Sequence, residues 1–507
     1  MNNRKHFFAL TAIALLTITA CNNNNSSSSN KVNSNSADDL ANLPMETDES
    51  LTNELTLVNA DGIYGNVYLP ENVNGAKITW FSSDANVINP KQDYDAAPGV
   101  VNRPASDKEI TLTAKIEKDG ATSKFEQKVL VKAAPIEIAE EDYVGYLFCH
   151  FTGQEGDVKH EQIYFALADK GEGLHFTDMN GATTSNLKPV LTSNVGDKGV
   201  RDPFIYRSPE GDTYRIIATD LSVKNRGGWK NDHDYTRKGS HYITMWESHD
   251  LVNWSEAKLL EVAREDAGMA WAPEMIYHEE TGQYVIIFSS TICNEDKSEI
   301  LERDCIYYTT TRDFVHFSET KKFIKNQPYP EGQTDQQTNA PHAINNDERK
   351  IIDASVIKID DWYYCAAKDG DNHENNGGIL IQRTQDIFDI DSWEKVCEIA
   401  DIPGLSASVE LTNKQLEGPE WFHYNVADRT DEDVDEIGLM ADMYMRNSGY
   451  LPLSTTDIMD IENANDSWKV LGSSDYSWSG LIKRHGSIMR LTHDEIEAIK
   501  EAYPNTK

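Results

Sequence analysis

The stretch that decides the fold reads Gly199-Val200-Arg201-Asp202-Pro203-Phe204-Ile205-Tyr206. An acidic residue, Asp202, stands at the start of a short apolar strand, and the proline after it cannot donate a hydrogen bond to a sheet ladder. A polar turn over 208–212 and a second strand over 214–219 follow. The same order of acid, strand, turn and strand recurs along the chain, which predicts a fold built from repeats.

A second motif alternates with the first, namely a polar turn that contains an aspartate and is followed by an aromatic residue. Its copies contain Asp250, Asp313, Asp386 and Asp457, with a weaker copy at Asp169. The first four aspartates lie about 70 residues apart, and each interval holds about four short strands, as one blade of a β-propeller requires. Five copies therefore predict a propeller of five blades.

The two ends of the repeat region predict how the ring closes. The weak first copy lacks an acid-and-strand unit of its own, whereas the repeats end with a lone strand over 487–491. We expect this strand to join the strands that begin at 146 in one composite blade, because that closure removes two exposed sheet edges. A surface helix over 494–502 follows. The predicted fold class is all-β.

The residues before the propeller form three segments. Residues 1–21 combine a basic start, a short apolar run and small residues before Cys21, which resembles the signal and lipobox of bacterial lipoproteins and implies acylation of Cys21. Residues 22–43 are a linker rich in Asn and Ser. Residues 44–136 resemble the degenerate bacterial immunoglobulin-like β-sandwich modules of secreted glycosidases, which predicts a spacer. We expect the propeller over 143–503 to be held outside the cytoplasm by a lipid anchor in a bacterial membrane.

The composition excludes some partners. The 507 residues are 39% hydrophobic and 26% charged, as in soluble globular proteins. The net charge of −37, from 84 acidic and 47 basic residues, argues against binding to nucleic acid or to an anionic membrane surface, because both need clustered cations. A neutral carbohydrate is unaffected by this charge. The cysteines other than Cys21 are odd in number and widely spaced, so we expect buried free thiols, although Cys293 and Cys305 could bridge a loop.

The propeller geometry brings acidic residues from distant parts of the sequence together. The first strand of each blade lines the central axis, so the residues that begin these strands converge there. The five residues that we place at these positions are Asp202, Glu274, Asp353, Glu417 and His485. Repulsion between carboxylates makes such a cluster unfavourable unless function requires it. Glycoside hydrolysis needs one protonated acid and one ionised carboxylate, and crowding raises the pKa of one member.

Each of these signals is weak by itself. Asp-Pro is a common turn, Glu420 competes with Glu417 for the same role, and His485 could be a hydrogen-bonded histidine of the core. Because these residues recur at one position of successive repeats, we interpret them together as a functional site.

The same residues carry a resemblance to a known family. The ordered motifs resemble those of glycoside hydrolase family 43 over about residues 143–500; they are Arg201-Asp202-Pro203, Trp271-Ala272-Pro273-Glu274, Ile352-Asp353-Ala354, Glu417-Gly418-Pro419 and Arg484-His485-Gly486-Ser487. The resemblance implies a five-bladed propeller that hydrolyses glycosidic bonds with inversion. It assigns Asp202 as general base, Asp353 as the residue that orients and tunes the acid, and Glu417 as general acid.

The resemblance also implies the surroundings of these acids. No cofactor is required, and His485 would sit on the axis beside a calcium ion or a water. The residues that we assign to substrate binding are Arg201, Trp271, Glu274, Trp421 and Arg484, with Glu274 and Trp271 in the pocket wall. From the residues themselves, we expect the exposed aromatic side chains of Trp229, Trp271 and Trp421 to be placed to stack on sugar faces. Residues 225–238 are an extra segment that could cover the pocket and favour exo action.

We therefore predict a monomeric, exo-acting α-L-arabinofuranosidase for plant-type polysaccharides or their oligosaccharides. A β-xylosidase and a galactosidase or galactofuranosidase of the same family are the alternatives. A non-catalytic carbohydrate-binding surface lipoprotein is the alternative from another class. A transferase that uses phosphate would need more cations beside the pit than Arg201 and Arg484 supply.

Overall fold

The computed structural model describes residues 40–91, 98–229, 235–328, 348–369, 378–399, 416–444, 449–460 and 467–505. The chain divides into two compact units, Met1–Pro44 and Met45–Lys507. The predicted signal with Cys21 and most of the linker lie outside the described residues. Among the helices that the structure describes, none is long and apolar enough to span a bilayer.

The N-terminal module is a four-stranded antiparallel sheet in the order β1-β2-β3-β4. Its strands are β1 (Asn72–Val73), β2 (Ala76–Ser82), β3 (Lys108–Lys118) and β4 (Ala121–Val131). A short helix that was not predicted, α2 (Glu49–Leu55), starts at Asp48, whose side chain accepts from the Ser50 amide. Leu51 and Leu55 of this helix pack into the core of the sheet. Outside these four strands, the described residues of the module pair only through isolated β-bridges, such as Ile88 with Val101. The second sheet of the expected sandwich is therefore not formed by the described residues.

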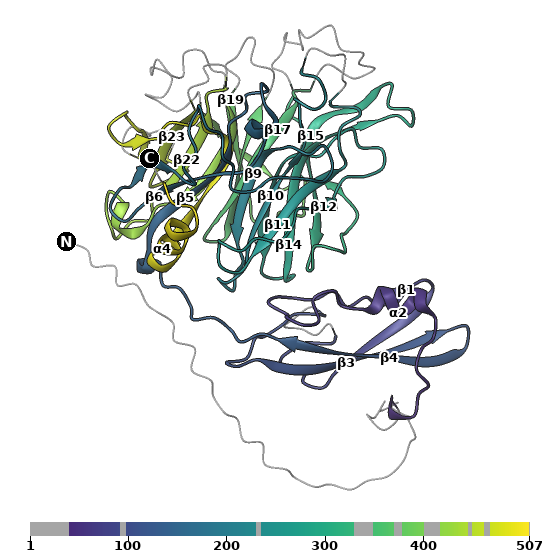
Figure 1. Ribbon diagram of the computed structural model, residues 1–507. Helices are drawn as coiled ribbons and strands as arrows, with labels where there is room; N and C mark the ends of the chain where they lie inside the picture. The colour runs from purple at the N-terminus through teal and green to yellow at the C-terminus, as the bar shows by residue number, and fades with distance from the viewer. Residues whose placement is uncertain are drawn as a thin grey trace, which may run out of the picture. The chain divides into compact units, whose positions relative to one another are not determined.

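Four blades of the propeller are continuous in sequence, and each is a four-stranded antiparallel sheet (Figure 1). The first blade contains β9 (Val200–Arg207), β10 (Tyr214–Asp220), β11 (Tyr242–Ser248) and β12 (Lys258–Glu261). The second contains β13 (Trp271–His278), β14 (Gln283–Cys293), β15 (Ile300–Thr311) and β16 (Lys321–Lys322). The third contains β17 (Ile351–Ile359), β18 (Trp362–Asp369), β19 (Gly378–Thr384) and β20 (Glu394–Glu398). The fourth contains β21 (Glu417–His423), β22 (Ile437–Asp442), β23 (Tyr450–Thr455) and β24 (Trp468–Val470).

The fifth blade joins the two ends of the propeller and confirms the predicted closure. Its strands, in order, are β26 (Arg484–Thr492), β5 (Tyr143–Phe151), β6 (Tyr164–Ala168) and β8 (Thr177–Asp178). A short parallel pair, β7 (Leu174–His175) and β25 (Tyr476–Ser477), adds a second link between the ends. Helix α4 (His493–Ala502) follows, with Thr492 and Glu495 forming a capping box. The 3-10 helices are η1 (Glu140–Asp142), η2 (Val158–Glu161) and η4 (Val426–Asp428).

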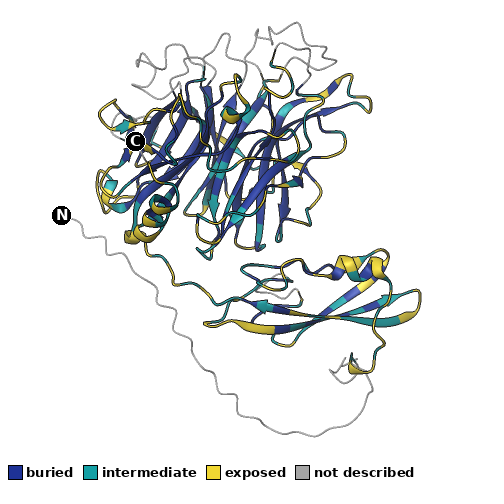
Figure 2. Cartoon of the chain, in the orientation of Figure 1, coloured by how far each residue is buried: buried dark blue, intermediate teal, exposed yellow. Residues whose placement is uncertain are grey.

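The repeated aspartates fold the outer turns of the blades. The Asp250 carboxylate accepts from the amides of Val252 and Asn253, and Asp313 makes the same turn with Val315 and His316. An aspartate at the start of a turn satisfies backbone amides that no strand pairs, which explains its recurrence. The inner strands are buried on both faces (Figure 2). The five cysteines after Cys21 are free and buried, as predicted, so Cys293 and Cys305 do not bridge.

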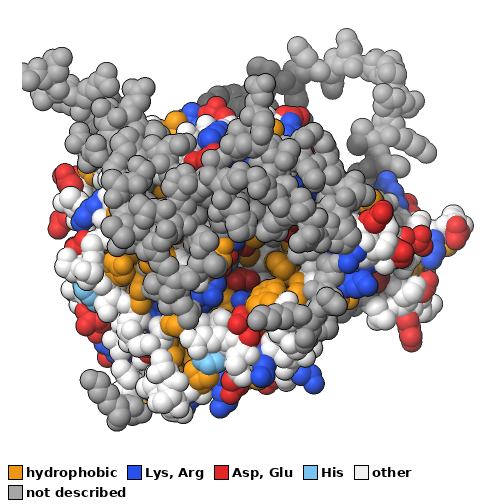
Figure 3. Space-filling model, turned by 90° about the horizontal axis from the view of Figure 1, so that it is seen from above, with side chains coloured by type: hydrophobic (Ala, Val, Ile, Leu, Met, Phe, Trp, Pro, Cys, Tyr) orange, Lys and Arg blue, Asp and Glu red, His pale blue; other side chains and the backbone are white. Residues whose placement is uncertain are grey.

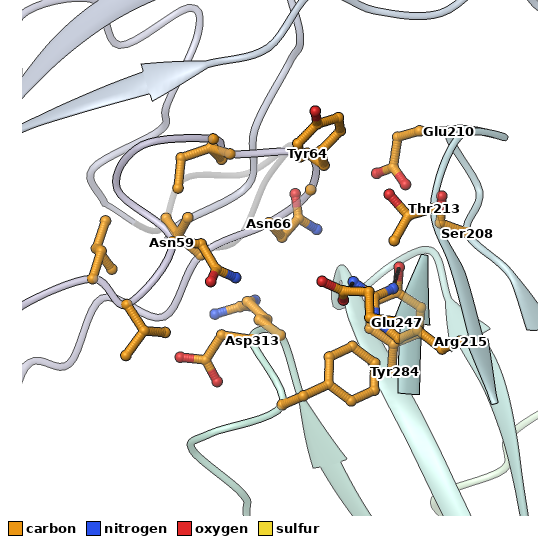
Figure 4. A pocket seen from close by; sticks show the side chains of 18 of the residues that line it. Asn59, Tyr64, Asn66, Ser208, Glu210, Thr213, Arg215, Glu247, Tyr284 and Asp313 are labelled. Carbon is orange, nitrogen blue, oxygen red and sulfur yellow. Dashed lines mark hydrogen bonds and ion pairs between the residues drawn. The ribbon is translucent and has the colours of Figure 1, made fainter. Parts of the chain in front are cut away.

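The module and the propeller belong to one compact unit and touch through polar side chains. Arg103 donates to both oxygens of Asp212 at 2.7 Å, and the rings of Tyr64 and His249 stack with centroids 3.8 Å apart. A cavity of about 300 Å³ lies beside these contacts (Figure 4). Within its lining, Arg215 pairs with Glu247 at 2.7 Å.

Candidate active site

All five blades begin with the same irregularity, which fixes the residues that face the axis. In each blade the pairing of the first two strands shifts register near the start of the first strand. The backbone is left-handed at equivalent positions in four blades, with φ of 50° at Asp202, 45° at Ala272, 55° at Asp353 and 49° at Gly418. The equivalent residue of the fifth blade is His485. For residues other than glycine this conformation is strained, and such strain clusters at functional sites.

This alignment corrects two of the predicted positions. Glu417 stands one residue before the left-handed position of its blade, and Glu274 stands two residues after it. Glu274 is only 4% exposed, and its place in the pocket wall stays a prediction. The offset is visible in the sequence, because Pro203 follows Asp202 directly whereas Pro419 stands two residues after Glu417.

Asp202, Asp353 and Glu417 nevertheless meet around His485. The Nδ1 atom of His485 lies 3.5 Å from Oδ1 of Asp202. The Gly418 amide donates to Asp353 at 3.4 Å, and a Cβ at Gly418 would come within 2.6 Å of the His485 ring. Burial lowers the pKa of His485, but the surrounding carboxylates, Asp202 first, outweigh it and raise the pKa. Seen from above, acidic, basic and hydrophobic side chains lie together at the centre of this face (Figure 3).

Asp202 is held by the neighbouring strand. The Thr219 hydroxyl on β10 donates to Oδ2 of Asp202 at 2.9 Å and accepts from the Ala272 amide of the next blade at 2.7 Å. Thr219 therefore fixes one carboxylate oxygen and links two blades. The other oxygen of Asp202 faces His485.

Glu417 lies between two cations. Lys368 Nζ donates to Oε2 at 2.8 Å, and the Arg484 guanidinium donates to Oε1 at 2.9 Å. Burial raises the pKa of Glu417, but these two cations outweigh burial and lower the pKa to about 2. The expectation that crowding raises the pKa of the general acid is therefore not met at Glu417.

Arg484 and Lys368 are themselves positioned by further groups. Arg484 Nε donates to Asp442 at 2.6 Å, and burial raises the pKa of Asp442 to about 6 although Arg484 opposes it. Lys368 is 7% exposed, and its Nζ lies 4.7 Å from the centre of the Tyr444 ring. Burial raises the pKa of Asp353 as well, against His485 and with Glu417. Lys368, Asp442 and Tyr444 were not predicted from the sequence.

A family model described as "Probable glycosyl hydrolase domain", of the glycoside hydrolase 43-related type, matches residues 141–497. This match spans well over half of the chain. The chain belongs to this family. A second model, the atrophied bacterial Ig domain, matches residues 48–134. The protein is thus a glycoside hydrolase with an immunoglobulin-like module.

The individual proteins that the chain resembles share less than a third of their residues with it in the matched regions. This glycoside hydrolase is 28% identical over 351 residues to an α-L-arabinofuranosidase of Bifidobacterium longum subsp. longum, a match that covers 62% of this chain and 29% of that protein. Among solved structures it is similar to an exo-β-1,3-galactanase from Clostridium thermocellum, with 14% identity, a TM-score of 0.35 and coverage of 58% and 51%. It is also similar to a thermostable family-43 glycoside hydrolase, with 17% identity, a TM-score of 0.35 and coverage of 58% and 81%.

The remaining predicted residues of the glycoside hydrolase lie in different surroundings. Arg201 is in the site, 3.1 Å from Glu161 and with its guanidinium 4.8 Å from the Phe151 ring. Trp271 is partly buried and packs against a small apolar cluster. Trp421 is 5% exposed in the core between the third and fourth blades, a placement that corrects its expected role in sugar stacking. The Trp421 side chain lies on the face of β21 that packs against the third blade.

The chemistry of the pit does not match a calcium site. Among the described residues no three His, Cys, Asp or Glu side chains are grouped so that they could hold a metal ion. Glu417, one of the carboxylates around His485, is instead paired with Lys368 and Arg484. Calcium at His485 stays a prediction from the resemblance.

Two further carboxyl groups on the first strands of their blades are buried and adjacent to each other. Glu274 and Glu420 are 4% and 2% exposed, and their side chains are hydrogen-bonded to each other. Oε2 of Glu274 accepts from the Val356 amide at 3.2 Å. Burial raises the pKa of Glu274 to about 7, and burial together with Glu274 raises the pKa of Glu420. The pair therefore shares a proton at neutral pH.

Replacing Glu420 with glutamine should stabilise the protein more at pH 8 than at pH 5. The folded pKa of Glu420 is raised by burial and by Glu274, so its contribution to stability is full below the unfolded pKa and is lost as pH rises toward the folded pKa. A glutamine amide donates without needing that proton. Thermal unfolding at both pH values measures the effect, and Glu432→Gln on the surface is the matched control. An equal change in melting temperature at both pH values would contradict the shared proton.

Proposed function

We propose that this glycoside hydrolase is an inverting, exo-acting α-L-arabinofuranosidase that acts on plant-type polysaccharides or their oligosaccharides. The observation that carries the proposal is the meeting of Asp202, Asp353 and Glu417 around His485 on one axis. The name of the Bifidobacterium longum relative supports the sugar. A β-xylosidase and a galactosidase or galactofuranosidase are the alternatives that the same site would serve.

The proposed reaction uses one carboxylate for each proton transfer. The Asp202 carboxylate takes a proton from water as the water oxygen attacks the anomeric carbon. The bond from that carbon to the leaving oxygen breaks, and the leaving oxygen takes a proton from Glu417. Glu417 can hold that proton only when substrate draws Lys368 or Arg484 away from it, because both cations favour the ionised form. Asp353, buried beside Glu417, orients it.

Proton NMR of the first product anomer tests the stereochemistry. With Asp202 acting through water, we expect the anomer released first to have the configuration opposite to that of the substrate. The 4-nitrophenyl glycosides of α-L-arabinofuranose, β-xylose and galactose, compared by kcat/KM, separate the sugar alternatives. Initial release of the retained anomer would contradict the assignment of Asp202 as a base, whichever sugar is preferred.

The cellular setting is proposed from the sequence alone. We infer that Cys21 carries lipid and anchors a monomeric enzyme to a bacterial membrane outside the cytoplasm, at the periplasmic face or at the cell surface. The basic start, apolar run and small residues before Cys21 have the order of a lipoprotein signal.

A further inference from the structure

An exposed tryptophan stands beside the catalytic acids. Trp229 is 49% exposed, whereas the other nine tryptophans are buried or partly buried. Its ring lies 5.5 Å from the guanidinium of Arg201, the residue that precedes Asp202. Arg201 therefore links the half-exposed indole to the strand that carries Asp202. Exposing so much aromatic surface has a cost that burial against a ligand removes.

The segment that carries Trp229 is firmly anchored. Glu161 is fully buried and accepts from the Ser222 hydroxyl at 2.6 Å and from the amides of Val223 and Lys224 at 2.9 and 3.2 Å. The same carboxylate binds Arg201 at 3.1 Å. Glu161 thus links residues 222–224 to β9, the strand that carries Asp202. A platform fixed in this way loses little conformational freedom when a ligand binds.

The indole is also oriented by hydrogen bonding and packing. Its Nε1 donates to Oε1 of Glu155 at 3.1 Å, and its ring packs on Tyr235 with centroids 4.8 Å apart. The Glu155 carboxylate lies at the rim, about a third exposed, where its free oxygen can accept from a hydroxyl. Two carboxylates, Glu155 and Glu161, share the single cation Arg201, so the cluster carries an excess negative charge.

We propose that Trp229 and Glu155 form a subsite for a neutral sugar ring next to the scissile bond, on the part of the substrate that the enzyme does not release first. The indole would stack on the C–H face of that ring, and Glu155 would accept from one of its hydroxyls. The excess negative charge disfavours uronic acids. This inference rests on the proposed hydrolysis and adds the class of residue that flanks the cleaved sugar.

Binding to an inactive enzyme tests the subsite without turnover. The starting protein is Asp202→Asn, and the probes are neutral oligosaccharides of arabinoxylan, arabinan and β-1,3-galactan, titrated by calorimetry. We expect Trp229→Ala to weaken the best-bound oligosaccharide at least tenfold, and Trp229→Phe to weaken it much less. Lys224→Ala, on the same segment but with an exposed side chain, is the matched control and should bind as the parent does.

The outcomes separate the two proposals. Equal binding by the Trp229→Ala and parent proteins, binding to none of the neutral probes, or tighter binding of an oligogalacturonide would overturn the subsite. Substantial hydrolysis by the Asp202→Asn protein would instead overturn the proposed mechanism, while its product pattern would still report whether Trp229 affects binding.

Discussion

Replacing Asp202 with asparagine is expected to lower kcat/KM by about 10²–10⁴-fold, the range that a general base contributes. Asparagine keeps the shape of the side chain, and its carbonyl can accept the hydrogen bond that the Thr219 hydroxyl now donates to Asp202. It cannot take a proton from the attacking water. The loss should therefore appear in the chemical step, with the binding of oligosaccharide changed little. Initial rates on the best aryl glycoside measure it.

The matched control for this change is Asp361→Asn. Asp361 is exposed in the turn between β17 and β18, at the far end of a strand that begins near the site, and should keep full activity. Equal melting temperatures would show that the fold survives in both variants. An Asp202→Asn protein that keeps activity within a few-fold of the parent would remove Asp202 from the chemistry.

Replacing Lys368 with methionine is expected to move the basic limb of the pH profile of kcat, which reports the enzyme–substrate complex, upward by about one unit or more. A general acid works in its protonated form, so activity falls as pH rises through its pKa. An adjacent cation lowers the pKa of a carboxyl by about 1–3 units, and Lys368 is one of two cations that hold the pKa of Glu417 at about 2. Removing it should let Glu417 keep its proton to higher pH.

The Lys368→Arg variant separates charge from packing. It keeps the cation beside Glu417, so its basic limb should stay close to that of the parent. Methionine fills a similar volume, and the remaining ion pair between Glu417 and Arg484 at 2.9 Å protects the buried carboxylate. A basic limb that stays in place in Lys368→Met, or moves equally in both variants, would show that Glu417 is not the proton donor whose pKa limits activity.

Much of the fold could be predicted because its signals are local. The turn aspartates such as Asp250 bond to amides two and three residues away, so their pattern is visible in the sequence. The composite blade followed from counting strands at the two ends. Helix α2 was missed because its seven residues carry only two buried side chains.

The site was only partly predictable because it depends on register. Asp202 and Asp353 stand at the left-handed position of their blades, and their place followed from the motif. Trp421 lies in a strand whose phase changes at the register shift, so its side chain faces the hydrophobic core. Lys368 reaches Glu417 from a neighbouring blade, a contact that no local pattern contains. A lone lysine in the apolar strand 362–369 was the available signal.

The pairing of β5 with β26 has a consequence for how the protein is made. Strand β5 is synthesised before the four continuous blades and β26 after them, so the ring cannot close until all four blades have left the ribosome. Until then β5 lacks one of its two neighbours in the fifth blade and exposes an unpaired strand edge. A deletion within β26 should therefore open the ring rather than only shorten one blade.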